Sequence, residues 1–403
     1  MVLTVAVLVA GCGDSDSDSG PPPPSQYFVS RPDLRPVPVS VLTPARGTAP
    51  GYVFLAPKKD VDQAGPLILD GRGQVVWFDP LETHGVTDFR VQTYRGKRVL
   101  TWWQGQSDKG IGNGHYVIMD DHYRQIATVQ AGKHPRVLTA PSTSTRPSPY
   151  FHVNSIEEDG SGRLLVSARN THAVYAIRKG DGAVLWRLGG KKTDFRMGPR
   201  ALFAWQHDAR RQPDSTIRLF DNATSDPGKG TSKVLVLRLD EGRRTATLVR
   251  SFVRSPPLSS TSQGNAQLLP DGHVFVGWGS KPYATEFDRA GEMLFDLRFG
   301  VDRVDSYRAF RFVWRGLPTT RPAVALRADD DRTTVYASWN GATEVARWRI
   351  LAGPDAAHLS PVATVPKHGF ETHATVGSSA ATFAVEALAA DGSVLRRSAA
   401  VDR

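Results

Sequence analysis

Residues 158–190 read EDGSGRLLVSARNTHAVYAIRKGDGAVLWRLGG. An Asp/Gly turn opens this unit, two short apolar strands follow, and a second Gly-Asp-Gly turn leads into an apolar strand that contains Trp186. Residues 270–300, PDGHVFVGWGSKPYATEFDRAGEMLFDLRFG, repeat the same order of turns and strands. Short strands that alternate with Asp/Gly turns in such units are typical of the blades of a β-propeller. The sequence therefore predicts an all-β fold.

The closing hairpin of this unit recurs at residues 67–77 and 387–395. From residue 27 onward, no window of a dozen residues has the apolar spacing of an amphipathic helix. We expect a β-propeller of six blades over residues 27–382, with a terminal hairpin in 383–403 that closes or caps the ring. The alternative is a tandem of β-sandwiches, which has the same pattern of strands and turns. The six expected blades are 51–80, 96–131, 151–190, 202–253, 263–300 and 323–366.

The chain has 403 residues, of which 40% are apolar, and this composition excludes disorder as its general state. It carries 50 Lys and Arg against 40 Asp and Glu, a formal charge of +10. The arginines are spread through every expected blade rather than clustered, so we expect no nucleic-acid partner. The charge favours anionic substrates or the cell envelope instead.

The single cysteine, Cys12, follows an apolar run at residues 2–10 that is too short to span a bilayer. Residues 8–12, LVAGC, resemble the lipobox of bacterial lipoproteins, which implies that Cys12 is acylated and becomes the mature N-terminus. We therefore expect a signal peptide at 1–11 and a lipidated Asp/Ser/Pro-rich tether at 12–26. The expected location is the extracytoplasmic face of the cell membrane. An ordinary cleaved signal, or a chance cysteine, is the alternative.

Three of the eleven histidines lie in segments rich in other polar groups, 151–156 (FHVNSI), 167–172 (SARNTH) and 205–209 (WQHDA). Each segment opens a blade or follows its first strand, the places that supply side chains to a propeller channel. His152 and Asn154 are two residues apart and so face the same side of a strand. They bind one ligand together or simply cap the strand. Arg169 follows an apolar strand, where a guanidinium needs an anion or a carboxylate partner.

His207 lies between Trp205 and Asp208, and the strand that follows ends in Asp221 and Asn222. A histidine held between an aromatic wall and a carboxylate is a candidate nucleophile or base. Histidines and carboxylates lack the short spacings of zinc or calcium sites, so we expect no catalytic metal and no cofactor.

Eight segments together resemble the arylsulfotransferase-like propeller proteins of actinobacteria and fungi and, more distantly, the bacterial aryl-sulfate sulfotransferases. The resemblance covers residues 28–398. It implies transfer of a sulfuryl group from a phenolic sulfate ester to a phenol, without a nucleotide donor, through a sulfated histidine. The segments are 30–34 (SRPDL), 101–105 (TWWQG), 152–156 (HVNSI), 186–190 (WRLGG), 205–209 (WQHDA), 220–222 (FDN), 277–280 (GWGS) and 338–344 (SWNGATE).

The resemblance also implies residue roles. The family's nucleophilic histidine matches His207, and its anion-binding residues match His152, Asn154 and Arg169, with Asn222 as a further substrate-binding residue. One departure is large: relatives have a long segment with a Leu-His-Glu motif where this chain has only residues 132–150, so a blade or half-blade and one active-site histidine are absent. The second hypothesis is therefore an inactive surface propeller that binds a ligand or partner. A quinone-dependent dehydrogenase is a weaker third.

Overall fold

The computed structural model describes residues 25–82, 85–108, 111–130, 151–160, 162–223 and 230–403. These residues form strands β1 to β30 and no helix, which confirms the all-β prediction. Because none of them is helical, the described part of the chain also has no helix long and apolar enough to cross a membrane. Cys12, the expected signal peptide and all but the last two residues of the expected tether lie outside this part.

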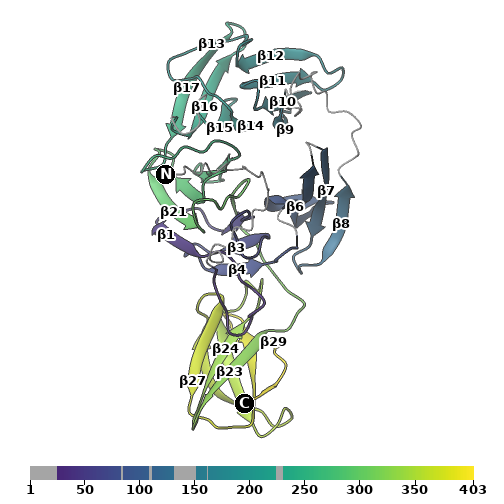
Figure 1. The fold of residues 1–403 in the computed structure, drawn as a ribbon, viewed down its shortest axis with the longest axis vertical. Helices are drawn as coiled ribbons and strands as arrows, with labels where there is room; N and C mark the ends of the chain where they lie inside the picture. The colour runs from purple at the N-terminus through teal and green to yellow at the C-terminus, as the bar shows by residue number, and fades with distance from the viewer. Residues whose placement is uncertain (1–24, 83–84, 109–110, 131–150, 161, 224–229) are drawn as a thin grey trace, which may run out of the picture.

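Five sheets surround a common centre as the blades of a β-propeller (Figure 1). Within each blade, neighbouring strands are antiparallel, except for one short outer strand at residues 196–197. Two blades follow the chain directly. They consist of β5 (Val86–Tyr94), β6 (Lys97–Asp108), β7 (Ile111–Met119) and β8 (Gln125–Gln130), and of β9 (Val153–Glu158), β10 (Arg163–Ala168), β11 (Ala173–Arg178) and β12 (Val184–Gly189).

The next blade carries an additional outer strand that comes from the segment preceding it. Strand β13 (Arg196–Met197) runs parallel to β17. The blade consists of β14 (His207–Arg211), β15 (Ile217–Asp221), β16 (Lys233–Asp240) and β17 (Thr245–Phe252).

Two blades close the ring by combining strands from the two ends of the propeller sequence. In one, β1 (Val39–Thr43) pairs with β21. In the other, β22 (Phe310–Phe312) pairs with β2. The first also contains β18 (Asn265–Leu268), β19 (Val274–Gly277), β20 (Tyr283–Phe287) and β21 (Met293–Phe299), and the second β2 (Tyr52–Leu55), β3 (Leu67–Leu69) and β4 (Val75–Phe78).

The blades pack in series around the ring, with one exception. Strand β9 packs on β14, β15 on β18, β19 on β22, and β22 on β5. Among the strands described, none of β5–β8 makes an extended contact with any of β9–β12. These two blades are joined through residues 131–150, which are outside the described part and include the segment, 132–150, where the sequence analysis expects a blade or half-blade to be absent.

The C-terminal residues form a separate two-sheet unit, and here the sequence-based expectation was wrong. Residues 323–366 are not a sixth blade, and the hairpin at 383–398 does not close the ring. One sheet contains β23 (Ala323–Asp329), β24 (Arg332–Ser338) and β27 (Glu371–Val376). The other contains β25 (Arg347–Gly353), β26 (Ser360–Pro366), β28 (Thr382–Leu388) and β29 (Val394–Arg397), with β30 (Val401–Asp402) beside β28.

Side chains of both sheets share one core, which includes Trp348, Val376 and Phe383, so the unit is a β-sandwich. It lies at one end of the molecule in Figure 1. The alternation of apolar and polar residues is the same in a sandwich strand and in a blade strand. What differs is the pairing: β24 pairs with β27 and β25 with β28, although other strands lie between them in the sequence. The sequence pattern therefore reveals the strands but not their partners.

Arg308, in the segment between β21 and β22, links three blades at the centre of the ring. Its Nη1 donates to Asp88 Oδ1 of β5 at 2.9 Å, and its Nη2 donates to the backbone oxygen of Asn154 on β9 at 2.9 Å. The same Nη2 lies 3.6 Å from Asp208 Oδ1 of β14. Burial alone would lower the pKa of Arg308, but the two carboxylates outweigh it and hold the pKa above its usual value.

The change Arg308→Met should lower the free energy of unfolding by about 3–5 kcal/mol, because it removes the buried cation between two buried carboxylates. Their other partners, Arg90 on Asp88 and Arg210 on Asp208, are more exposed than Arg308. Arg303→Met is the matched control, since the Arg303 side chain is 74% exposed beside Asp60 and should contribute less than about 1 kcal/mol. Urea unfolding followed by tryptophan fluorescence measures both. Equal losses in the two variants would contradict the central role of Arg308.

Candidate active site

The five residues predicted for the site lie at strand ends in two neighbouring blades. His152 directly precedes β9, and Asn154 lies on that strand. Arg169 follows β10, and its backbone N–H donates to the His152 carbonyl at 2.9 Å. In the next blade, His207 begins β14 and Asn222 follows β15. Because β9 packs on β14, these strand ends meet near the centre of the ring.

The His207 ring is held by both of its nitrogens. Its Nδ1 lies 2.7 Å from Asn222 Oδ1, and its Nε2 accepts the backbone N–H of Gln263 at 3.2 Å. The amide nitrogen of Asn222 donates to the carbonyls of Ser260 and Gln263, which turns the amide oxygen toward His207. This network assigns the proton to Nδ1 and the lone pair to Nε2.

His207 is neutral in this environment. Only 2% of its surface is exposed, and this burial lowers the pKa of His207 to about 3. The hydrogen bond with Asn222 acts in the opposite direction, and the positive charges of Arg169 and Arg308 together with His152 lower the pKa further. A neutral imidazole with its lone pair on Nε2 has the protonation state that a nucleophile requires.

Arg169 supplies a positive charge without a counter-charge of its own. Its guanidinium lies 4.3 Å above the Trp205 ring and donates to the side-chain oxygen of Asn170 and the backbone oxygen of Thr261. No described carboxylate pairs with it, and its buried Nε has no hydrogen-bond partner among the described groups. The site therefore retains cationic and N–H capacity for an anion.

The pKa values of two histidines near Arg169, His152 and His172, are lowered. Partial desolvation and then the charge of Arg169 lower the pKa of His152. The same two causes lower the pKa of His172, with Lys191 adding to them. The His172 ring lies 4.4 Å from the Trp205 ring. Both imidazoles are consequently uncharged near neutral pH, and Arg169 provides the fixed charge of this group.

The two asparagines bind the protein itself. The Asn154 side chain donates to the Gln206 carbonyl at 2.8 Å and accepts the Asp208 N–H at 3.3 Å, on either side of His207. The polar atoms of the Asn222 side chain are also all used by protein groups. In this geometry both residues position His207, whereas the sequence predicted that they bind substrate.

Several residues of the site adopt a left-handed backbone that is uncommon for side-chain-bearing residues. The φ angles are 51° at His152, 55° at His172, 58° at Trp205, 55° at Asp208 and 64° at Gln263. Such conformations cost roughly 1–3 kcal/mol each and concentrate at functional sites. Because these residues lie in the segments around His207, the backbone conformation indicates a functional site here independently of the side-chain chemistry.

Sequence reasoning missed three residues that build the site. Gln206 is fully buried and donates to Ser167 Oγ and to the carbonyls of Ala168 and Ala173, which attaches β14 to the neighbouring blade. Gln263 acts through its backbone N–H, and Arg308 comes from the ring-closing segment. Of these three residues, only Gln206 could have been suspected from the sequence, because it directly precedes His207.

The described residues contain one group of potential metal ligands, Asp271, His273 and Glu286, on the β18–β21 blade. The buried Glu286 already pairs with Arg311 at 2.7 Å, accepts the Ala49 N–H and contacts His273 Nδ1 at 3.0 Å. These partners account for its charge, so the group is an ion-pair cluster that does not involve His207. The expected Leu-His-Glu position, at 132–150, lies outside the described residues.

Comparison with protein families gives one match, over residues 136–300, to the family described as Arylsulfotransferase (ASST). The match contains all five predicted site residues and confirms, for this part of the chain, the resemblance to arylsulfotransferases found in the sequence. No curated protein matches the chain.

Solved structures similar to the chain include a β-propeller domain of Cps50 (Swd1) from Myceliophteria thermophila, at 10% identity, 75% coverage of this chain, 96% of that chain and a TM-score of 0.34. Glutaminyl cyclase from Myxococcus xanthus shows 12% identity, coverages of 67% and 95%, and a TM-score of 0.28. A catalytically inactive virginiamycin B lyase from Staphylococcus aureus shows 9% identity and a TM-score of 0.24, and the match covers 89% of this chain and 97% of that chain. These TM-scores are too low to support any argument about function.

The lowered pKa of His207 predicts a specific pH dependence of stability. Between about pH 6.5 and about pH 3 the unfolded chain binds a proton at His207 that the folded chain does not, so the free energy of unfolding falls as the pH falls. From about pH 7 to about pH 5, this contribution is about 2 kcal/mol. His207→Asn should therefore lose about 2 kcal/mol less than the wild type over this interval in urea unfolding.

The control is His358→Asn, because His358 is exposed in the C-terminal sandwich beside Asp355. It should retain the fall in the free energy of unfolding that His207→Asn loses, because His207 is intact in this variant. If His207→Asn followed the wild type in parallel, His207 would be protonated in the folded protein and the assigned tautomer would be wrong.

Proposed function

We propose that this protein is an aryl-sulfate sulfotransferase that moves a sulfuryl group from a phenolic sulfate ester to a phenol through a sulfated His207. The observation that carries the proposal is the His207 ring itself, buried and neutral, with its Nδ1 on Asn222 and its lone pair on Nε2. The arylsulfotransferase match over residues 136–300 supports the reaction class.

In the first step, the Nε2 lone pair forms a bond to sulfur while the bond between sulfur and the phenolic oxygen breaks. The phenolate leaves and takes a proton from solvent. The sulfated ring carries a positive charge, which the Nδ1–H shares with Asn222 Oδ1. In the second step, the acceptor phenol oxygen attacks sulfur, the N–S bond breaks, the lone pair returns to Nε2, and the acceptor's proton passes to solvent.

Arg169 is the group that we assign to the sulfate oxygens. It has an unpartnered Nε and no described carboxylate, and its stacking on Trp205 fixes the plane of the guanidinium. Together with partial desolvation, which is the larger cause, its charge lowers the pKa of His152 and His172. Preorganised donors of this kind stabilise charge that develops on the transferring group. Substrate entry has to displace the Gln263 N–H from Nε2.

The decisive experiment is transfer from a chromogenic aryl sulfate to a phenol acceptor. His207→Ala should lower the rate by at least about 1,000-fold, because no nucleophile remains. Arg169→Met should lower kcat/KM by about 100- to 1,000-fold through lost charge stabilisation. The exposed His358→Ala should retain the wild-type rate, and after rapid acid-free quenching, mass spectrometry should find a sulfuryl adduct on the peptide with His207.

The second candidate is a propeller that binds aryl sulfates without transferring them. It is favoured by the hydrogen bond that occupies Nε2 and by the short segment at 132–150. Calorimetry separates the two candidates. Aryl sulfate binding that depends on Arg169, with no transfer and no adduct on His207, would replace the enzyme proposal with this one.

The proposal also includes a lipid anchor at Cys12 and a location on the extracytoplasmic face of the cell membrane. Its support is the sequence LVAGC at residues 8–12. Cells that express the full chain and are labelled with an alkyne fatty acid should yield labelled protein in the membrane fraction. Cys12→Ala should abolish the label, and retention of the label would refute acylation at this residue.

A further inference from the structure

A cavity of about 480 Å³ lies between the β14–β17 and β18–β21 blades, away from His207. Its lining includes the turn that joins β14 and β15, whereas His207 is at the opposite end of β14 and pairs with Phe220 at the end of β15. Four residues of extended chain separate the two places, about 13 Å along the strand. The volume is in the range that encloses small organic ligands.

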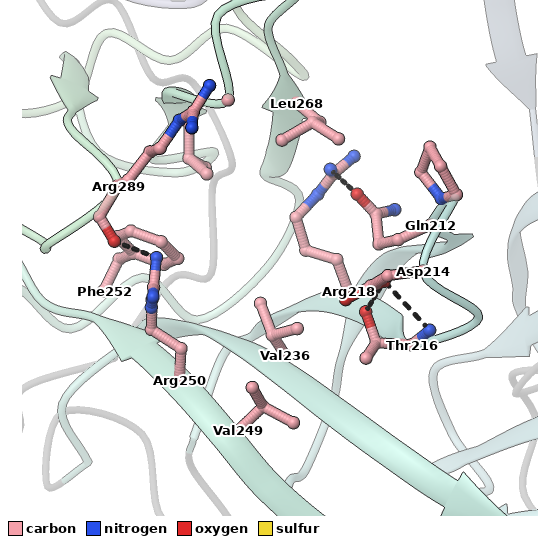
Figure 2. A pocket seen from close by; sticks show the side chains of 13 residues that line it. Gln212, Asp214, Thr216, Arg218, Val236, Val249, Arg250, Phe252, Leu268 and Arg289 are labelled. Atoms are coloured by element: carbon pink, nitrogen blue, oxygen red, sulfur yellow. Dashed lines mark hydrogen bonds between the residues drawn. The ribbon is translucent and has the colours of Figure 1, made fainter.

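Arginines and an apolar wall meet in this cavity (Figure 2). The aliphatic side chains of Val236 and Val249 lie between Arg218 on one side and the pair Arg250 and Arg289 on the other. Further apolar lining comes from Phe252, Leu268 and Val274, and Asp214 is the single acidic residue of the lining. The cavity therefore combines a nonpolar surface with an excess of positive charge.

Arg218 is a buried cation with unused hydrogen-bonding capacity. Only 5% of its surface is exposed, its Nη1 donates to Gln212 Oε1 at 2.5 Å, and its Nε has no partner among the described groups. Burial lowers the pKa of Arg218 to about 10, although the carboxylates of Asp208 and Glu157 act in the opposite direction. Burying a guanidinium whose N–H group has no hydrogen-bond acceptor costs free energy, and a bound anion would supply that acceptor.

The neighbouring charges do not provide that anion. No described carboxylate lies within ion-pair distance of Arg218, Arg250 or Arg289. Arg250 donates to the backbone oxygen of Arg289, and Arg289 donates to that of Asp271. Asp214 accepts both the N–H and the hydroxyl of Thr216, as Figure 2 shows.

We propose that this cavity is a second binding site, which takes a small organic anion with its acidic head on Arg218 and its aromatic or aliphatic body on Val236 and Val249. Arg250 and Arg289 at the rim add attraction for the same charge. The site is independent of the proposed sulfotransfer reaction, because none of its residues contacts His207 or Arg169.

The test uses 8-anilino-1-naphthalenesulfonate, a fluorescent anion with an apolar body, titrated against the full chain. Arg218→Met should weaken its binding by about 10- to 100-fold, the value of a charge-assisted hydrogen bond. Because a buried substitution can unfold the protein, the rim variant Arg250→Glu is measured as well, and it should weaken binding by at least about 5-fold. The uncharged probe N-phenyl-1-naphthylamine should bind both variants within about 2-fold of the wild type.

Arg243→Glu is the matched control, because it reverses the same charge on the same blade at a side chain that is 85% exposed and outside the cavity. It should bind the anion as the wild type does. Equal affinity of Arg250→Glu and Arg243→Glu would overturn the proposal. Loss of binding in Arg169→Met alone would overturn it too, since the anion would then occupy the candidate active site.

Discussion

The contact between Arg308 and the carboxylates of Asp88 and Asp208 is the constraint on which the rest of the propeller depends. In most of the ring, neighbouring blades hold each other through packed inner strands, but the β5–β8 and β9–β12 blades lack such packing among the described residues. Arg308 contacts both, through Asp88 and the Asn154 carbonyl. Its other carboxylate, Asp208, directly follows His207, so the side chain that holds the ring also fixes the strand that begins at His207.

The site is organised by hydrogen bonds from backbone and amide groups more than by charged side chains. Asn154 brackets His207 from β9, Asn222 orients its ring, and the Gln263 N–H occupies its lone pair. Each of these contacts crosses from one strand end to another. Burial keeps the imidazole uncharged, although the hydrogen bond with Asn222 acts in the opposite direction. Arg169 is then the remaining fixed charge available for an anionic substrate.

Much of this arrangement was predictable from sequence, and the failures have physical causes. The all-β fold and the strand ends that carry His152, Arg169 and His207 follow from turn chemistry and period-two alternation. The C-terminal sandwich was misread because the same alternation serves blades and sandwiches. The role of Gln263 had no signal, because a backbone N–H is present at nearly every residue. Arg308 was also invisible, since its partners come from distant blades.

The closure of the ring has a consequence for how the chain folds. Val39 pairs with Phe299, and Tyr52 pairs with Phe312. Strands β1 and β2 therefore cannot complete their pairing until β21 and β22 have been synthesised. Until those strands leave the ribosome, two early edges have no partner, and such edges are prone to pair with other chains. Contacts of this sequence separation also slow folding. The exposed interval ends only when β21 and β22 have been made and the ring closes.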